Sequence, residues 1–171
     1  MGTVIAEAQR FSNSVQDIKN GDYPVVISPS ADDCIEGADI VVTATTSAKP
    51  VFSGDHIQKG THINAIGSFT PFMQEIDTRT ILKANKIVTD NSEETWTVAG
   101  DLLVPFEKGQ IDHSSLYAEL GDIVAGKVRG RENEDEITLY ESIGFAALDI
   151  AVAAAAYRNS LDLGIGRMVD W

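Results

Sequence analysis

The chain has 171 residues, of which 43% are apolar and 23% are charged, and this composition is typical of one ordinary soluble domain. Its 13 Lys and Arg residues and 26 Asp and Glu residues give a net charge of −13, which repels nucleic-acid phosphates and anionic lipids, so we expect neither nucleic acid nor membrane as a partner. No apolar stretch is long enough for a membrane span and the first residues do not resemble a signal peptide, which favours a cytoplasmic location. The single cysteine, Cys34, cannot form an intramolecular disulfide, and we expect it to be a small buried apolar residue.

The first part of the chain alternates helical and extended patterns. Apolar residues at three- and four-residue steps predict a helix over residues 3–19. The β-branched run 24–27 predicts a short strand, and the acidic stretch 31–36 predicts a helical turn. Residues 39–46 are continuously apolar and β-branched, which is the pattern of a parallel strand covered on both faces.

The same alternation continues through the middle of the chain. We expect a short helix over residues 54–58, a strand over 62–66, a helix over 78–84 and a strand over 86–89. Strands separated by helix-length segments form βαβ units with a mostly parallel sheet. The sequence therefore predicts an α/β fold.

The last part of the chain is mainly helical. Helices are expected over residues 93–99 and 114–125, and the charged stretch 127–136 is expected to be an exposed loop. Residues 136–140 could form a short strand or an extended segment. The alanine-rich stretch 142–157 predicts a helix that is apolar nearly all round and requires burial on more than one side.

Several motifs resemble functional sites but lack necessary parts. Residues 121–128 nearly match a phosphate-binding P-loop, but Val128 stands where a hydroxyl residue is needed, so we interpret this stretch as a helix end. Residues 164–166 lack the third glycine of a dinucleotide fingerprint. Asp149 within the apolar helix is either a buried site residue or part of a solvent-facing stripe. No metal site is expected, because the histidines are far apart and lack ligand partners: His56, His62 and His113.

Small polar residues follow each of the three clearest strands. In an open parallel sheet, ligands bind outside the carboxyl ends of the strands. Glycine and small hydroxyl residues let backbone N–H groups approach phosphates or a flat ring, and a carboxylate or amide can orient a carboxamide or ribose, which suits a dinucleotide. The alternative is that these residues only form turns. The candidates are Thr45-Thr46-Ser47, Gly67-Ser68 and Asp90-Asn91.

Six segments resemble the ornithine cyclodeaminase/mu-crystallin family in order and spacing over nearly the whole chain. The resemblance implies a homodimer whose subunits have a Rossmann-type NAD(P) domain and a second domain for substrate binding and dimerisation. The activities that it implies include ornithine cyclodeamination, alanine dehydrogenation and ketimine reduction. The segments are ADIVVTATTSAKPVFSG from Ala38, GTHINAIGS from Gly60, MQEID from Met73, AGDLLVPFEKGQI from Ala99, YAELGDIVAGKVRGR from Tyr117 and EITLYESIGFAALDIA from Glu136.

The resemblance also implies which residues bind the cofactor, NAD or NADP. Thr43 and Thr45 would lie along the dinucleotide, and the segment from Ser142 to Gly144 would lie near the nicotinamide. Phe69 stands where cyclodeaminases have a catalytic aspartate and Met73 where they have a lysine, which is a departure from the ornithine-cyclising pattern and leaves the catalytic residues unassigned. Beside the ribose and nicotinamide we expect Ala65, Ile66, Gly67 and Ser68.

Members of this family have a substrate domain and a GxGxxG segment before the helix that resembles residues 5–11 here. We therefore expect residues 1–141 to form a partial NAD(P)-binding domain, and residues 142–171 to form a helix and tail that pack on a domain missing from this chain. One hypothesis is a portion of an NAD(P)-dependent amino-acid oxidoreductase or cyclodeaminase that acts on a small amino or imino acid once completed. The alternative is a non-catalytic remnant that associates with itself or a partner chain through open strand edges at 24–27 and 39–46.

Overall fold

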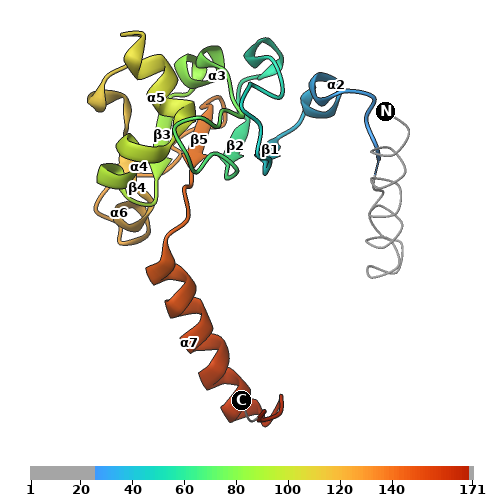
Figure 1. Ribbon diagram of the computed structural model, residues 1–171, viewed down its shortest axis with the longest axis vertical. Helices are drawn as coiled ribbons and strands as arrows, with labels where there is room; N and C mark the ends of the chain where they lie inside the picture. The colour runs from blue at the N-terminus through green and yellow to red at the C-terminus, as the bar shows by residue number, and fades with distance from the viewer. Residues whose placement is uncertain (1–25, 170–171) are drawn as a thin grey trace.

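A five-stranded parallel sheet organises the protein, as seen in a computed structural model that describes residues 26–169 (Figure 1). The strand order is β1-β2-β5-β3-β4, and every neighbouring pair is parallel. This arrangement confirms the predicted α/β fold. The strands are β1 (Ile40–Thr43), β2 (His62–Ala65), β3 (Lys86–Thr89), β4 (Ala118–Glu119) and β5 (Thr138–Glu141).

Helices connect the strands and follow the last one. The helices expected over residues 31–36, 78–84 and 93–99 and in the alanine-rich stretch are present, whereas α5 was not predicted. The helices are α2 (Ala31–Ile35), α3 (Thr78–Lys83), α4 (Ser92–Val98), α5 (Gly100–Glu107), α6 (Leu120–Val124) and α7 (Ala146–Leu163), with 3₁₀ helices at Gly54–His56 and His113–Ser115.

The last strand in the sequence, β5, lies in the middle of the sheet. All four residues of β5 pair with β2 on one side and with β3 on the other. The sequence pattern left this segment open between a strand and an extended segment. Its central place was decided by pairing with strands that lie far away in the sequence.

The hydrophobic core lies between one face of the sheet and the helices α3 and α5. Ile63 and Leu139 are almost fully buried on this face, and Ile81 and Leu102 face them from the two helices. Burial of one such side chain stabilises the fold by about 1.5–3 kcal/mol. The core therefore orients the sheet and fixes where its carboxyl edge lies.

The other face of β1 is open. Ile40 is 65% exposed and Val42 is 58% exposed, whereas Val41 on the core face is buried. The prediction that this strand is covered on both faces is therefore wrong for the described residues. β1 lies at one edge of the described sheet, and its Val41 belongs to the hydrophobic core on the other face.

The prediction of a single helix over residues 114–125 is wrong. A 3₁₀ helix, the short strand β4 and the helix α6 occupy this stretch instead. The Tyr117 N–H donates to the Ile87 carbonyl at 2.8 Å, and Ala118 then pairs with Val88. Pairing with β3 supplies the backbone hydrogen bonds here, so tertiary contacts outweigh the helical spacing of the apolar residues.

Three expectations concern the first 35 residues, of which the structure describes only those from Val26 onward. The helix predicted over residues 3–19 lies outside the described residues, as does part of the strand predicted over 24–27, while Val26 and Ile27 belong to no regular element. Cys34 is exposed rather than buried, because α2 is a short helix that turns only Ile35 toward the core.

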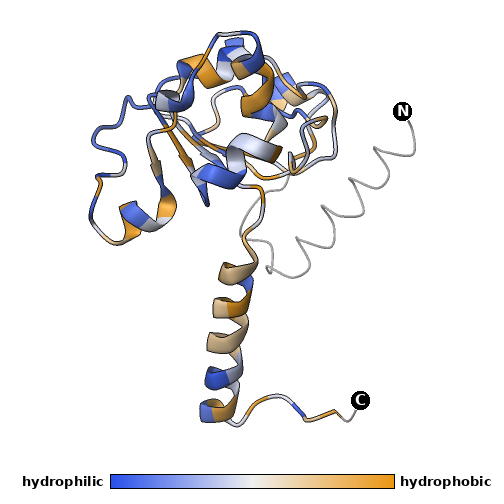
Figure 2. Ribbon diagram, turned by 60° about the vertical axis from the view of Figure 1, so that its left-hand side comes forward, coloured by the Kyte–Doolittle hydropathy of each residue, from blue (hydrophilic) through white to orange (hydrophobic). Residues whose placement is uncertain are grey.

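The helix α7 extends away from the body of the domain (Figure 1). It has 18 residues and no buried residue, and its surface is apolar over much of its length (Figure 2). Asp149 is exposed, which agrees with the solvent-facing interpretation, and Gly164 ends the helix in the left-handed conformation with φ 63°. No helix among the described residues, α7 included, is both long enough and apolar enough to span a bilayer.

Candidate functional site at the carboxyl edge of the sheet

All five parallel strands end together at one edge of the sheet. The last residues of neighbouring strands are register partners across the sheet. Because these strands are parallel, the segments that follow them meet at this edge, as the sequence predicted. The partners that form this row are Thr43, Ala65, Glu141, Thr89 and Glu119.

Backbone contacts join the segments that follow β1, β2 and β5. The Ile66 N–H donates to the Thr43 carbonyl at 3.0 Å, and the Ser142 N–H donates to the Ala65 carbonyl at 2.9 Å. A Cβ atom on Gly67 would lie 2.3 Å from the Thr45 carbonyl oxygen. Only glycine fits at this position, so the loops after β1 and β2 are in direct contact.

The eight residues expected to bind the cofactor separate into an accessible set and a buried set. Thr45 and Gly144 are exposed, Ile66 is 46% exposed and Ser142 is half-buried. The accessible residues line the edge, and the buried ones lie beneath it. The buried ones are Thr43, Ala65, Gly67 and Ser68, of which Ser68 donates its hydroxyl hydrogen to the Met73 carbonyl at 3.0 Å.

A buried glutamate accepts hydrogen bonds from both loops. The Thr45 N–H and the Gly67 N–H both donate to the carboxylate of Glu75, the second at 2.8 Å. The residues after the strands were expected to let backbone N–H groups approach phosphates or a flat ring, but these two N–H groups donate to a protein carboxylate instead. The accessible residues of the edge are uncharged (Thr45, Ile66, Ser142 and Gly144), and they suit a flat ring better than a phosphate.

The start of α5 positions this glutamate. Asp101 Oδ1 accepts from the Glu75 N–H at 2.7 Å and from the Ile76 N–H at 2.9 Å. A Cβ atom on Gly100 would lie 1.9 Å from the Met73 carbonyl oxygen, so the helix can approach the segment that contains Met73 only with glycine there. Burial raises the pKa of Asp101 to about 7, against the lowering effect of its two backbone hydrogen bonds.

A third acid, Glu141, lies at the end of the central strand. Its side chain is fully buried, and neither carboxyl oxygen has a hydrogen-bond partner among the described residues. Burial raises its pKa well above the usual value, and the charges of Asp101, Glu75 and Asp90 raise it further. Both effects favour the protonated form of Glu141.

Asp90, which follows β3, orients two hydroxyl groups. Ser142 donates its hydroxyl hydrogen to Asp90 Oδ2 at 2.6 Å, and the Tyr140 hydroxyl donates to Asp90 Oδ1. Burial, together with the bond to Asp90, raises the pKa of Tyr140 to about 12. Because the hydrogen of Ser142 is directed to Asp90, its oxygen is left to accept a hydrogen bond from a ligand.

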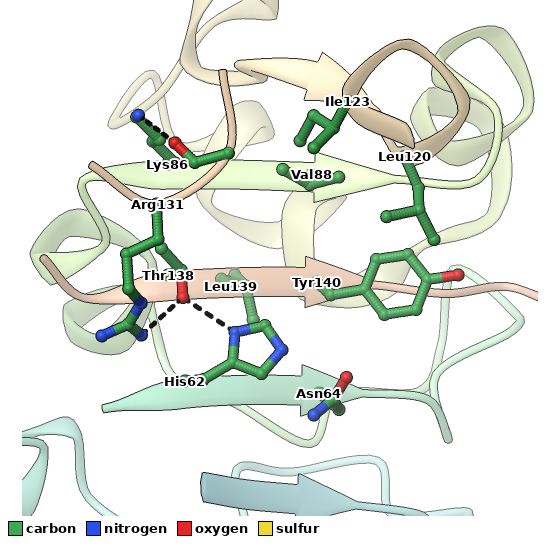
Figure 3. Close-up of a pocket in the computed structure, with 11 residues that line it drawn as sticks. His62, Asn64, Lys86, Val88, Leu120, Ile123, Arg131, Thr138, Leu139 and Tyr140 are labelled. Atoms are coloured by element: carbon green, nitrogen blue, oxygen red, sulfur yellow. Dashed lines mark hydrogen bonds between the residues drawn. The ribbon is translucent and has the colours of Figure 1, made fainter. Parts of the chain in front are cut away.

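A separate cavity of about 350 Å³ lies over the middle of the strands, on the open face of the sheet (Figure 3). Thr138 Oγ1 lies 2.8 Å from His62 Nδ1 and 2.9 Å from a guanidinium nitrogen of Arg131. Burial lowers the pKa of His62, which favours its neutral form. This cavity was not predicted from the sequence, and of the residues described above at the carboxyl edge it includes only Tyr140. Within residues 26–169, no three His, Cys, Asp or Glu side chains are placed to bind a metal ion.

The three buried acids were missed as site residues in the sequence. Glu75 and Asp101 belong to the family-like segments MQEID and AGDLLVPFEKGQI, but no role was assigned to either residue from the sequence. A signal was available for Glu141, because it follows Leu139 and Tyr140 in an extended pattern, and burial of an acid is costly unless it has a structural reason.

The family model of the ornithine cyclodeaminase/mu-crystallin proteins matches residues 5–163 of this chain. The chain belongs to this family. The match covers all the segments on which the resemblance was based.

Similar proteins include reductases and dehydrogenases. The Delta(1)-pyrroline-2-carboxylate reductase of Bacillus thuringiensis subsp. konkukian is 41% identical over 165 residues, which are 96% of this chain and 50% of the relative. The structure of the Thermococcus litoralis Delta(1)-pyrroline-2-carboxylate reductase in complex with NADH and L-proline matches with a TM-score of 0.84 and 37% identity, over 94% of this chain and 49% of that one. An archaeal alanine dehydrogenase dimer with bound NAD matches with a TM-score of 0.77 and 36% identity, over 92% of this chain and 48% of that one. The chain thus spans about half the length of the relatives that it matches.

Proposed function

We propose that this chain forms the nicotinamide-binding side of an NAD(P)-dependent enzyme that transfers hydride between the cofactor and the carbon–nitrogen bond of a small amino or imino acid. The observation that supports this proposal most strongly is the row of parallel strand ends at which the loops after β1, β2 and β5 meet. In an open parallel sheet, ligands bind outside this edge. A solved relative has NADH and L-proline bound, which is consistent with this chemistry.

In this proposal the accessible residues of the edge contact the cofactor. Thr45 would lie along the dinucleotide, and Ile66 would pack against the ribose or the nicotinamide. Ser142 would accept a hydrogen bond from the carboxamide, because Asp90 accepts the hydrogen of its hydroxyl. Thr43, Ala65 and Ser68 would support these contacts from beneath.

The substrate that we propose is a cyclic imino acid or the corresponding amino acid, rather than ornithine. Phe69 and Met73 replace the aspartate and lysine that the cyclodeaminase resemblance would require. The similarity to pyrroline-2-carboxylate reductases favours reduction of an imine. The bound nicotinamide would supply the hydride, and the apolar side chains at the edge would exclude water from it.

We propose that the groups that bind the pyrophosphate of the cofactor lie outside the carboxyl edge. The eight residues expected to contact the cofactor include no arginine or lysine, so they cannot neutralise a pyrophosphate. We propose that residues 1–141 contribute one wall of the cleft and that residues 142–171 pack on the domain that carries substrate.

The first test is the location of NADH binding. We expect calorimetry to detect weak NADH binding by the chain, and Ile66→Asp to weaken it about tenfold, because an added carboxylate would lie against the ring and the phosphates. Leu82→Asp is the matched control, since Leu82 is 59% exposed near the end of α3, just before β3 begins, and therefore lies toward the opposite edge of the sheet. Equal NADH affinity of the two variants would refute the location, and micromolar binding with turnover of an imino acid by this chain alone would refute the proposal that the site needs a second wall.

A second candidate function is self-association without catalysis. It is favoured by α7, which has no buried residue, and by the open face of β1 with Ile40 and Val42 exposed. Light scattering tests it, because an apolar helix and an open sheet face would produce a dimer or larger species. A single monomeric species over a wide range of concentration would argue against this candidate.

A further inference from the structure

The cavity on the open face of the sheet lies between two unlike walls (Figure 3). One wall is apolar and is formed by Val88 of β3 with Leu120 and Ile123 of α6. The other wall is polar, and we call its four side chains the polar row. The cavity volume of about 350 Å³ is within the range of small-molecule sites, which combine apolar walls with a few polar groups. The polar row consists of Arg131, Thr138, His62 and Asn64.

Arg131 brings a positive charge and free N–H groups to the polar row. Its guanidinium donates to the Gly60 carbonyl at 2.7 Å and to Thr138 Oγ1 at 2.9 Å, and both acceptors are uncharged. These bonds leave other N–H groups of the guanidinium available to a ligand. Among the described residues, no carboxylate lies within ion-pair distance of Arg131. A guanidinium with free N–H groups is the side chain that binds a carboxylate best.

A buried lysine holds the loop that carries Arg131. Lys86 Nζ donates to the Gly130 carbonyl at 2.5 Å and to Glu132 at 2.8 Å, and Glu136 lies 3.7 Å from the same ammonium group. The acids of this loop therefore pair with Lys86 and leave the charge of Arg131 available. Because the loop is already held, binding at Arg131 requires less ordering of the chain.

The hydrogen bonds along the polar row run in one direction and leave a donor at its far end. Because Thr138 Oγ1 accepts from Arg131, its own hydrogen is available to His62 Nδ1, which lies 2.8 Å away. Burial and the charge of Arg131 lower the pKa of His62, and a neutral imidazole that accepts at Nδ1 carries its hydrogen on Nε2. A hydrogen bond with Asn64 raises this pKa in part, which identifies Asn64 as an acceptor whose NH2 group is left to donate.

We propose that this cavity binds a small monocarboxylic acid with an apolar body. Its carboxylate would pair with Arg131, and its body would lie against the apolar wall. A cationic or zwitterionic ligand fits less well, because the described lining contains no acid that could bind an ammonium group. The site is separate from the accessible residues of the carboxyl edge, so this inference does not rest on the proposed function.

The experiment is an NMR titration of the full chain near neutral pH, with benzoate as the probe and benzamide as its uncharged match. We expect benzoate to shift the Arg131 and His62 side-chain signals saturably with a Kd of about 1 mM, and benzamide to bind at least about tenfold more weakly. Equal affinity for the two probes, or no saturable shift of these signals with benzoate, would overturn the proposal. These measurements use the wild-type chain, so they do not depend on whether any variant folds.

Two substitutions separate a built site from general attraction to a charged loop. Arg131→Gln removes the charge but keeps an N–H donor for Thr138, and benzoate should bind about tenfold more weakly. Arg129→Gln is the matched control, because the Arg129 side chain is 85% exposed, pairs with Glu132 and does not line the cavity. It removes the same charge from the same loop and should leave the affinity within about twofold of wild type. Equal losses in the two variants would overturn the site.

Inorganic phosphate tests the apolar part of the assignment, since it has a negative charge and no apolar body. We expect it to bind at least about tenfold more weakly than benzoate, and equal affinity would overturn the assignment to a monocarboxylic acid. None of these measurements uses NADH. Failure of NADH to bind at the carboxyl edge would therefore refute the proposed function and leave this site as described.

Discussion

Replacing Gly67 by alanine should destabilise the domain and disrupt the carboxyl edge. The added Cβ would lie 2.3 Å from the Thr45 carbonyl oxygen and 2.5 Å from the carboxyl carbon of Glu75. Neither neighbour can move freely, because one is backbone and the other accepts hydrogen bonds from both loops. The two loops must therefore separate, and the bond from the Gly67 N–H to Glu75 must lengthen or break.

The expected loss of stability follows from these two effects. Overpacking at a buried position costs about 1–3 kcal/mol. Loss of a hydrogen bond to a charged group costs about 1.5–3 kcal/mol. Because the two losses share one movement and do not simply add, we expect about 3 kcal/mol, or a fall in Tm of about 10 °C for a domain of this size.

Thermal and urea unfolding followed by circular dichroism would measure this loss, with Gly121→Ala as the matched control. Gly121 lies in α6 with no atom within 4 Å of a Cβ added to it, so alanine there should stabilise the helix by about 0.5–1 kcal/mol. If Gly67→Ala changed the stability by less than about 0.5 kcal/mol, the contact between the loops would not be as close as described.

Three further predictions concern the core, a loop and a helix end. Ile63→Ala should cost about 3 kcal/mol in unfolding experiments, whereas Ile40→Ala on the open face of β1 should cost less than about 1 kcal/mol, and similar losses would contradict the assignment of the faces. Lys86→Met removes the bonds from Nζ to the Gly130 carbonyl at 2.5 Å and to Glu132 at 2.8 Å, so trypsin should cut the 127–136 loop faster, and an unchanged cleavage rate would refute this role. Asn91→Ala removes the side chain that caps the start of α4, so the free energy of unfolding in urea should fall by about 1 kcal/mol. An unchanged free energy of unfolding would contradict this cap.

Most regular elements could be predicted because their signals are local. The β-branched run at residues 86–89 became β3 with the same bounds, and the alanine-rich stretch became α7. Strand ends were placed well enough that the residues expected to bind a cofactor end or follow neighbouring parallel strands. The helix α5 was missed, and its interior Pro105 weakens the helical pattern there.

The composition and the spacing of apolar residues by themselves determined that this is an α/β protein with a parallel sheet, because both depend only on residues that are near neighbours along the chain. Only the tertiary structure decided that β5 lies at the centre, that one face of β1 stays open, and that Glu75 and Asp101 lie beneath the loops. Glu75 binds the N–H of Thr45 from 30 residues away, and Asp101 binds the N–H of Glu75 from 26 residues away. Strand order and the burial of charge depend on which distant segments meet, and local periodicity carries no information about that.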